Sequence, residues 1–153
     1  MKFQKDWIPE FSGKYNFLSN FSNSPIKYEG IVYPTVEHAF QAAKTLNINK
    51  HLEIAHASTP GQAKRLGRSV KLRSDWEEIK VDIMRECLRL KFKIPELREA
   101  LLETGNAELT EGNTWHDNFW GVCYCSKCRA SAHGKNVLGL LLMEVRDEIR
   151  RKN

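Results

Sequence analysis

The chain has 153 residues and a formal net charge of +5, with 41% hydrophobic and 28% charged residues. A chain of this length suits one compact domain, residues 1–153, which can bury a sizeable core without disulfides or a metal. The balanced composition argues against long disordered segments. The positive charge is compatible with a phosphate-bearing ligand, but it is too small to indicate nucleic-acid binding by itself.

The sequence contains no export or membrane signal that we recognise. Its first residues, MKFQKDWIPEF, lack the apolar core of a signal peptide, and the apolar runs are shorter than a membrane span. We therefore expect a cytoplasmic protein without a membrane partner. Cytoplasmic thiols are kept reduced, so we expect the four cysteines to be free thiols or metal ligands.

The first third of the chain predicts a loop followed by a small β-hairpin. Residues 15–23 are rich in Asn and Ser between aromatic residues. Residues 26–28 and 31–33 are short β-prone runs. The pair Glu29-Gly30 between them suits a tight turn.

Helix signals dominate from residue 35 onward. Thr35 is the expected N-cap of a helix that ends near residue 45. A weaker helix is predicted over 47–57. A third begins at Pro60, because proline suits the first helical position, and ends near Gly67.

The second half predicts three further helices. Ser74 and Glu77 form a capping-box pattern for a helix that runs to about residue 93, with an apolar stripe that includes Cys87. Pro95 starts a helix that ends near residue 104. Asn136 opens the last helix, whose first turns are apolar on nearly every side and are expected to be buried. About six helices with little strand indicate a predominantly helical α+β fold.

The helix over 35–45 carries a candidate site. Glu37, Gln41 and Lys44 fall on one helical face at i, i+4 and i+7. The more common interpretation is a surface Glu–Lys ladder. The alternative is a carboxylate, an amide and an ammonium group directed into a pocket. The neighbouring His38 is interpreted as a partly buried or surface histidine.

Two features before and within the helix over 74–93 have two interpretations each. Trp76 lies on the apolar stripe and is more often a core residue than part of a ligand site. A basic cluster precedes it, which is usually a solvated face but could hold a phosphate. Its members are Arg65, Arg68, Lys71 and Arg73.

Residues 111–128, EGNTWHDNFWGVCYCSKC, combine acids, aromatics and cysteines. Asp117 and Trp120 could bind a base and stabilise a sugar cation, or could form a capped turn with a core tryptophan. Glu111 is a second acid nearby. Asn136, in the segment G-K-N-x-L-G, is either a helix N-cap or part of an anion site at the helix start.

The cysteines of this stretch have metal-ligand character. Three thiolates and an imidazole would complete a tetrahedral zinc site, and the candidates are Cys123, Cys125, Cys128 and His133. Structural zinc sites more often join two separated knuckles, and the second knuckle is missing, so we favour a metal-free loop and keep the zinc site as the alternative. A catalytic cysteine is disfavoured because no base is paired with any of the three.

Several motifs in chain order resemble the NADAR family, also called YbiA-like. No single motif is specific, but the ordered set is. The motifs are L-S-N-F (18–21), the hairpin over 28–33, T-V-E-H-A-F-Q-A-A-K (35–44), A-K-R-L-G-R (63–68), W-x7-M (76–84), L-L-x-T-G (101–105), D-N-F-W-G (117–121) and G-K-N-x-L-G (134–139).

The resemblance implies a single YbiA-like domain with N-glycosidase activity and no cofactor. One branch of the family cleaves ribosylated pyrimidine phosphates of riboflavin synthesis. Another removes ADP-ribose from modified guanine in nucleic acid. The resemblance assigns Glu37 and Asp117 as catalytic carboxylates, with Glu111 as the acid upstream. It assigns six substrate contacts: Trp76, Trp120, Lys44, Arg68, Asn20 and Asn136.

Two classes of function remain open at this point. The first is an enzyme that hydrolyses an N-ribosidic bond of a phosphorylated small molecule, or of ADP-ribosylated guanine in nucleic acid. The second is a module that binds ADP-ribose or a nucleotide without turnover. The presence of both acids, Glu37 and Asp117, favours the enzyme. The cysteine stretch replaces a loop that is often rich in glycine in the family.

Overall fold

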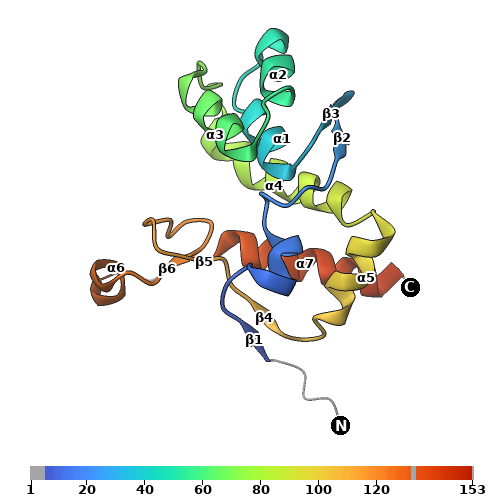
Figure 1. Ribbon diagram of the computed structural model, residues 1–153, viewed down its shortest axis with the longest axis vertical. Helices are drawn as coiled ribbons and strands as arrows, with labels where there is room; N and C mark the ends of the chain where they lie inside the picture. Colours follow the sequence, from blue (N-terminus) through green and yellow to red (C-terminus); the bar gives the residue numbers. More distant parts are fainter. Residues whose placement is uncertain (1–5, 132–133, 153) are drawn as a thin grey trace. The chain divides into compact units, whose positions relative to one another are not determined.

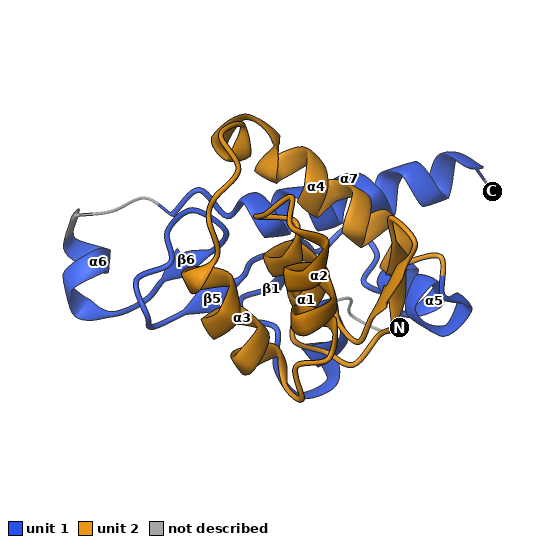
Figure 2. Cartoon of the chain, turned by 90° about the horizontal axis from the view of Figure 1, so that it is seen from above, with its two compact units in different colours: residues 1–19, 94–153 blue, residues 20–93 orange. Residues whose placement is uncertain are grey.

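The structure of the protein is a computed structural model, which describes residues 6–131 and 134–152 (Figure 1). The chain divides into two compact units (Figure 2). Unit 2 consists of residues 20–93, and unit 1 consists of the chain on either side of it. The fold class is α+β and predominantly helical, as the sequence predicts.

Unit 2 begins with the predicted hairpin. Strands β2 (Ile26–Tyr28) and β3 (Ile31–Tyr33) are antiparallel, and Tyr28 lies opposite Ile31. The turn residues Glu29 and Gly30 have φ angles of 48° and 85°, in the region that a tight two-residue hairpin turn requires. The hairpin prediction is confirmed.

Four helices complete unit 2: α1 (Val36–Ala42), α2 (Ile48–Ala55), α3 (Pro60–Ser69) and α4 (Trp76–Lys91). Helix α1 packs against the other three, and all seven of its residues are buried. The hydroxyl groups of Thr35 and Thr59 accept the backbone amides of His38 and Gln62. These two N-caps therefore begin α1 and α3 at the predicted places.

The predicted capping box of α4 is wrong. The N-cap position is Asp75, which makes no side-chain cap hydrogen bond. Glu77 instead pairs with Lys80, at 2.6 Å between Oε2 and Nζ. The predicted core position of Cys87 is confirmed. Burial raises the pKa of its thiol to about 12, which leaves the thiol protonated and unreactive.

Unit 1 contains short parallel strand pairs that the sequence pattern does not predict. Strand β1 (Trp7–Ile8) pairs with β4 (Glu108–Leu109), and β5 (Gly112–Asn113) pairs with β6 (Val122–Cys123). A 3-10 helix, η1 (Gly13–Leu18), occupies part of the expected loop. Elements of two residues are too short to show a hydrophobic period.

The helices of unit 1 are α5 (Pro95–Glu103), α6 (Ser126–Ser131) and α7 (Val137–Lys152). The start of α7 is not buried on every side as expected, because Leu140 is 56% exposed. Further along α7, the buried Arg146 donates from Nη1 to Thr104 Oγ1 at 2.8 Å. This bond connects α7 to the end of α5.

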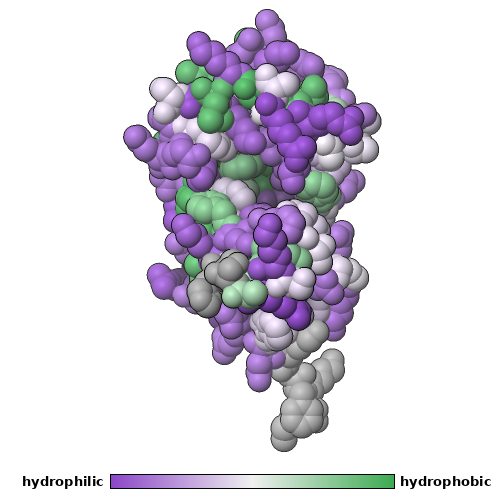
Figure 3. Space-filling view, turned by 90° about the vertical axis from the view of Figure 1, so that its left-hand side faces the viewer, coloured by the Kyte–Doolittle hydropathy of each residue, from purple (hydrophilic) through white to green (hydrophobic). Residues whose placement is uncertain are grey.

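No helix within the described residues is long and apolar enough to cross a membrane. The face shown in Figure 3 is largely hydrophilic, with separate hydrophobic patches. Some of the exposed apolar side chains belong to unit 2: Leu46, Ile48, Leu52 and Leu72. The cytoplasmic location stays a prediction.

Candidate functional site

Glu37 lies in the first turn of α1 and is only 7% exposed. Gln41, one turn further along, donates from Nε2 to Glu37 Oε1 at 2.8 Å. The Glu37 amide donates to the carbonyl oxygen of Asn20 at 3.1 Å. The interpretation of this face as a surface ladder is therefore wrong: the spacing is the predicted one, but Glu37 and Gln41 are buried and bonded to each other.

Gly67 in α3 allows the two helices to approach at this pair. A Cβ atom added to Gly67 would lie 2.0 Å from Gln41 Oε1 and 2.9 Å from Gln41 Cβ. Any larger residue must displace the Gln41 side chain. The glycine therefore helps to fix the amide that orients the Glu37 carboxylate.

Lys44 provides positive charge near this carboxylate. The side chain is half-buried, and burial lowers the pKa of its ammonium group while the nearby Glu37 raises it. Lys64 and Arg68 of α3 lower it further by charge repulsion. Lys44 thus shares an electrostatic neighbourhood with one acid, Glu37, and with the two basic groups of α3.

Asn20 and Trp76 also belong to the surroundings of α1. Asn20 donates weakly to Met84 Sδ at 3.5 Å, and its Oδ1 is buried without a hydrogen-bond partner within the described part of the chain. Such an atom costs free energy unless a ligand or water supplies a donor. Trp76 is 5% exposed and packs on Phe40, with ring centroids 5.0 Å apart. Trp76 is therefore a core residue at the start of α4.

His38 is a structural residue of α1. Its Nδ1 lies 2.8 Å from Thr35 Oγ1, and its Nε2 lies 3.0 Å from the carbonyl oxygen of Ala57. The carbonyl can only accept, so Nε2 carries the proton and Nδ1 accepts from the hydroxyl group. Burial lowers the pKa of the ring, although the bond to Ala57 raises it. The ring is neutral and links α1 to the chain after α2.

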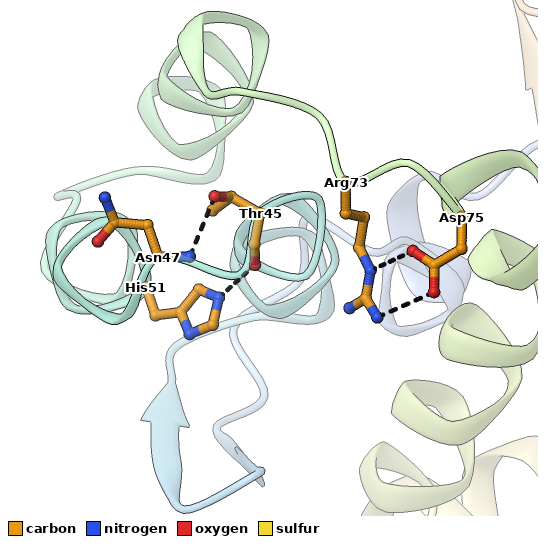
Figure 4. A network of polar contacts seen from close by, with 5 residues as sticks. All are labelled: Thr45, Asn47, His51, Arg73 and Asp75. Atoms are coloured by element: carbon orange, nitrogen blue, oxygen red, sulfur yellow. Dashed lines mark hydrogen bonds and ion pairs between the residues drawn. The ribbon is translucent and has the colours of Figure 1, made fainter.

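Unit 2 also contains an open cavity of about 590 Å³, lined by residues 45–47, 50 and 69–74. Figure 4 shows the polar contacts beside it. Arg73 pairs with Asp75 through two bonds of 2.7 and 3.2 Å, and this pair holds the pKa of the Asp75 carboxyl below its usual range. His51 contacts the carbonyl oxygen of Thr45 at 2.6 Å. Glu37 does not line this cavity, and Arg73 beside it is already paired with Asp75. We therefore do not assign the cavity to the reaction.

In unit 1, Asp117 is fixed by its own loop. Its Oδ1 accepts the backbone amides of Phe119 and Trp120 at 3.1 and 2.9 Å. Asn113 accepts the amide of Asp117 through Oδ1 and donates from Nδ2 to its carbonyl oxygen. The carboxylate therefore has a defined orientation, and the capped-turn interpretation is confirmed for one of its oxygens.

Trp120 is half-buried and lies edge-on to Phe119, with ring centroids 4.8 Å apart. Asn136 is buried, and its side chain bonds to backbone on both sides: Oδ1 accepts the Glu111 amide, and Nδ2 donates to Leu109. These bonds give Asn136 a structural role and use one donor and one acceptor position of its amide. They also place the Glu111 backbone at the start of α7.

The three cysteines after Trp120 gather around a histidine that the sequence analysis did not select. His116 Nδ1 lies 3.3 Å from Cys128 Sγ, 3.4 Å from Cys125 Sγ and 3.9 Å from Cys123 Sγ. The predicted fourth ligand, His133, lies outside the described residues. Burial raises the pKa of the Cys123 thiol, but hydrogen bonds from neighbouring residues outweigh it and bring the pKa to about 7.

Sequence reasoning missed three contributors: Gly67, Asn113 and His116. Gly67 stands within A-K-R-L-G-R, but nothing in that string shows which side chain faces the glycine. Asn113 follows a glycine in a polar segment, which signals a turn and no specific partner. His116 precedes the cysteines, whereas the fourth ligand predicted from the sequence, His133, follows them.

Comparison with known proteins identifies relatives over nearly the whole chain. Residues 3–150 match the family described as "NADAR domain". The N-glycosidase YbiA of Escherichia coli is 44% identical over 141 residues, which cover 90% of this chain and 84% of that protein. An N-glycosidase of Nostoc punctiforme is 40% identical over 154 residues, which cover 97% of this chain and 91% of that protein.

Two further relatives extend the comparison. A riboflavin biosynthesis protein of Vibrio vulnificus is 36% identical over 88% of this chain, which spans 36% of that longer protein. The NMR structure of E. coli YbiA superposes with a TM-score of 0.81 at 41% identity, covering 97% of this chain and 88% of that one. The fold and the ordered motifs thus agree with the same family.

Proposed function

Because this chain belongs to the NADAR family, we propose that it hydrolyses the N-glycosidic bond between a ribose and a base. The proposed substrates are the ribosylamino-pyrimidine phosphates of riboflavin biosynthesis. The names of the relatives support this choice: N-glycosidases match over most of the chain, and a riboflavin biosynthesis protein matches over the same region.

The observation that carries the proposal is the buried, oriented carboxylate of Glu37. Cleavage of an N-riboside develops positive charge on the ribose as the base departs. A carboxylate close to the anomeric carbon stabilises that charge or activates the attacking water. The water oxygen becomes bonded to the anomeric carbon, and its proton goes to the departing nitrogen. The bond from Gln41 holds Glu37 in one orientation for this role.

The basic groups near Glu37 suit a phosphate on the same substrate. Lys64 and Arg68 both lie close enough to Lys44 to repel its charge, and an anion bound among them would relieve this repulsion. A 5′-phosphate would place the ribose within reach of the same helix. We assign Asn20 to the ribose, because its buried Oδ1 can accept a hydroxyl hydrogen bond.

Asp117 is proposed as the second acid, on the basis of the family resemblance. One of its oxygens accepts two backbone amides, which fixes the orientation of the carboxylate. Trp120 is the proposed stacking surface for the base, since its half-buried ring is exposed enough to make contact. The proposal gives Trp76 a packing role beside Phe40.

Base release from defined substrates tests this proposal. Purified protein is incubated with a ribosylamino-pyrimidine phosphate, its dephosphorylated form, and DNA that carries ADP-ribosylated guanine, and products are separated by chromatography. We expect release from the first substrate, slower release from the second, and loss of about 10²- to 10⁴-fold in Glu37→Gln. Asp117→Asn is tested in parallel.

Each alternative outcome of this experiment would change one part of the proposal. Release only from the DNA substrate would assign the chain to the ADP-ribosyl-guanine branch. Tight calorimetric binding with no product after long incubation would identify a binding module instead. Full activity of Glu37→Gln together with loss in Asp117→Asn would move the principal catalytic role to Asp117.

A further inference from the structure

We infer that one zinc ion binds to four side chains of unit 1: His116, Cys123, Cys125 and Cys128. The four ligand atoms lie within 4.8 Å of one another. We call this group the cysteine cluster. The inference does not depend on the proposed reaction, because its test measures metal content and not activity.

The distances within the cysteine cluster fit a tetrahedral zinc site. With Zn–S bonds of about 2.3 Å and Zn–N bonds of about 2.0 Å, a tetrahedron separates sulfur from nitrogen by about 3.5 Å. The three observed distances from His116 Nδ1 are 3.3, 3.4 and 3.9 Å. A single ion at the centre could therefore contact all four atoms with only small adjustments of the side chains.

The types of ligand atom in the cysteine cluster indicate both which metal binds and what role the metal has. Three thiolates and one imidazole are soft ligands, which favour zinc over magnesium or calcium. Four protein ligands fill a tetrahedron and leave no position for a reactive water, so the ion is structural. This role agrees with a glycosidase whose chemistry uses carboxylates and no metal.

Neighbouring groups form hydrogen bonds to the cysteine cluster, as they commonly do around zinc-bound thiolates. The backbone amide of Cys128 donates to Cys125 Sγ at 3.4 Å. The Asn118 side chain forms a hydrogen bond with the Cys128 thiol, and it also accepts the backbone amide of Cys123 at 2.9 Å. Such bonds orient the ligands and disperse the negative charge of three thiolates.

The local fold explains how His116 joins residues that follow it in the chain. The parallel pairing of β5 with β6 places Asn113 opposite Cys123. The Asn113 side chain accepts the amides of Trp115 and Asp117, which flank His116. His116 has a φ of 69°, a left-handed conformation that histidine adopts more often than most other non-glycine residues. The resulting turn brings the ring to Cys123, the last residue of β6.

The site gives the cysteine-rich stretch a function. An ion bound by the cluster would cross-link the turn at His116 to β6 and to α6. Asp117 is the residue next to His116, so the same cross-link would restrict the loop that carries this acid. Metal binding would stabilise the folded state of this part of unit 1, where the hydrophobic core is small.

Metal analysis of the purified chain tests the inference. Protein is produced in zinc-supplemented medium and purified without chelators or a histidine tag, and zinc is measured by mass spectrometry. We expect about one zinc per chain, and replacement by Co²⁺ should give the visible bands and thiolate charge-transfer bands of a tetrahedral site. The variant Cys128→Ser should lose most of both signals, whereas Cys87→Ala should keep them.

The two histidines provide the sharpest control. Competition with a chromophoric chelator measures zinc affinity in His116→Ala and His133→Ala. We expect affinity to fall about tenfold or more in His116→Ala, as for loss of one ligand, and to be unchanged in His133→Ala. The opposite pattern would overturn the ligand set. Wild-type protein without zinc and without a cobalt spectrum would overturn the site itself, whatever the activity.

Discussion

Two regions of this protein hold functional side chains in different ways. Around Glu37, a fully buried helix, a matching glycine on α3 and a side-chain bond from Gln41 fix the carboxylate. Around Asp117, hydrogen bonds within a loop and the proposed metal perform the same task. Packing is cooperative over whole helices, whereas a loop depends on a few bonds and is more sensitive to the loss of any one.

The largest effect on stability should come from the loop. Asn113 is buried and bonds to the backbone of Glu111, Trp115 and Asp117. Asn113→Ala should lower the free energy of unfolding by about 2–4 kcal/mol, because it removes several hydrogen bonds of about 0.5–1.5 kcal/mol each. Urea denaturation with and without zinc measures this change. Asn16→Ala, at an exposed position in η1, is the control. Equal effects of the two substitutions would show that the loop is not held by Asn113.

Replacing Gly67 tests the role of packing around Glu37. The new methyl group of Gly67→Ala would overlap Gln41, so we expect a loss of about 1–3 kcal/mol and reduced base release. The control is Gly61→Ala in the same helix, where the nearest atom is 3.8 Å away. Alanine there should be neutral or stabilising by about 0.5–1 kcal/mol. If both variants unfold at the same denaturant concentration, the packing account of α1 fails.

Substituting Lys44 sharpens the assignment of the basic groups. Lys44→Met keeps most of the apolar stem and removes the charge. The KM for a phosphorylated substrate should therefore rise about tenfold. The KM for the dephosphorylated substrate should hardly change. Lys50→Met is the control, because Lys50 is exposed and paired with Glu53 on α2. Initial rates over a range of substrate concentrations give these values. A similar rise for both substrates would remove Lys44 from the phosphate contact.

The smallest effect concerns pH. The pKa of His38 is lowered by burial from an ordinary value of 6.5, so the unfolded chain binds protons more readily than the folded one. The stability from neutral His38 is complete above pH 6.5 and declines as the pH falls below it. Denaturation between pH 8 and pH 5 should show a shallower decline in His38→Gln than in wild type. His56→Gln, at an exposed position, should follow wild type.

Sequence reasoning succeeded where a regular helix carries the site. The spacing of Glu37 and Gln41 placed them on one face, and Thr35 marked where that helix begins. The predicted helical position of Lys44 is wrong, because α1 ends at Ala42 and Lys44 lies in the turn after it. The spacing did not predict that the face is buried, because burial depends on how α3 approaches at Gly67. Contacts of this kind are set by tertiary packing, which one-dimensional spacing does not encode.

Sequence reasoning was weaker where loops determine the arrangement. The cysteines offered a metal site only as the less favoured alternative, and the histidine beside them in the described part of the chain precedes them and occupies a left-handed turn. The strand pairs around it are only two residues long, so no alternation revealed them. Asp75 begins α4 although Ser74 and Glu77 match a capping box, because a local pattern states a preference that neighbouring contacts can override.

The central claim is that Glu37 carries the hydrolysis. The most direct measurement is the rate of base release from a ribosylamino-pyrimidine phosphate by wild type, Glu37→Gln and the control Glu78→Gln. Glu78 is also an acid in a first helical turn, but it is exposed. We predict that Glu37→Gln is slower by about 10²- to 10⁴-fold while Glu78→Gln matches wild type and all three unfold alike. Equal rates for wild type and Glu37→Gln would contradict the account.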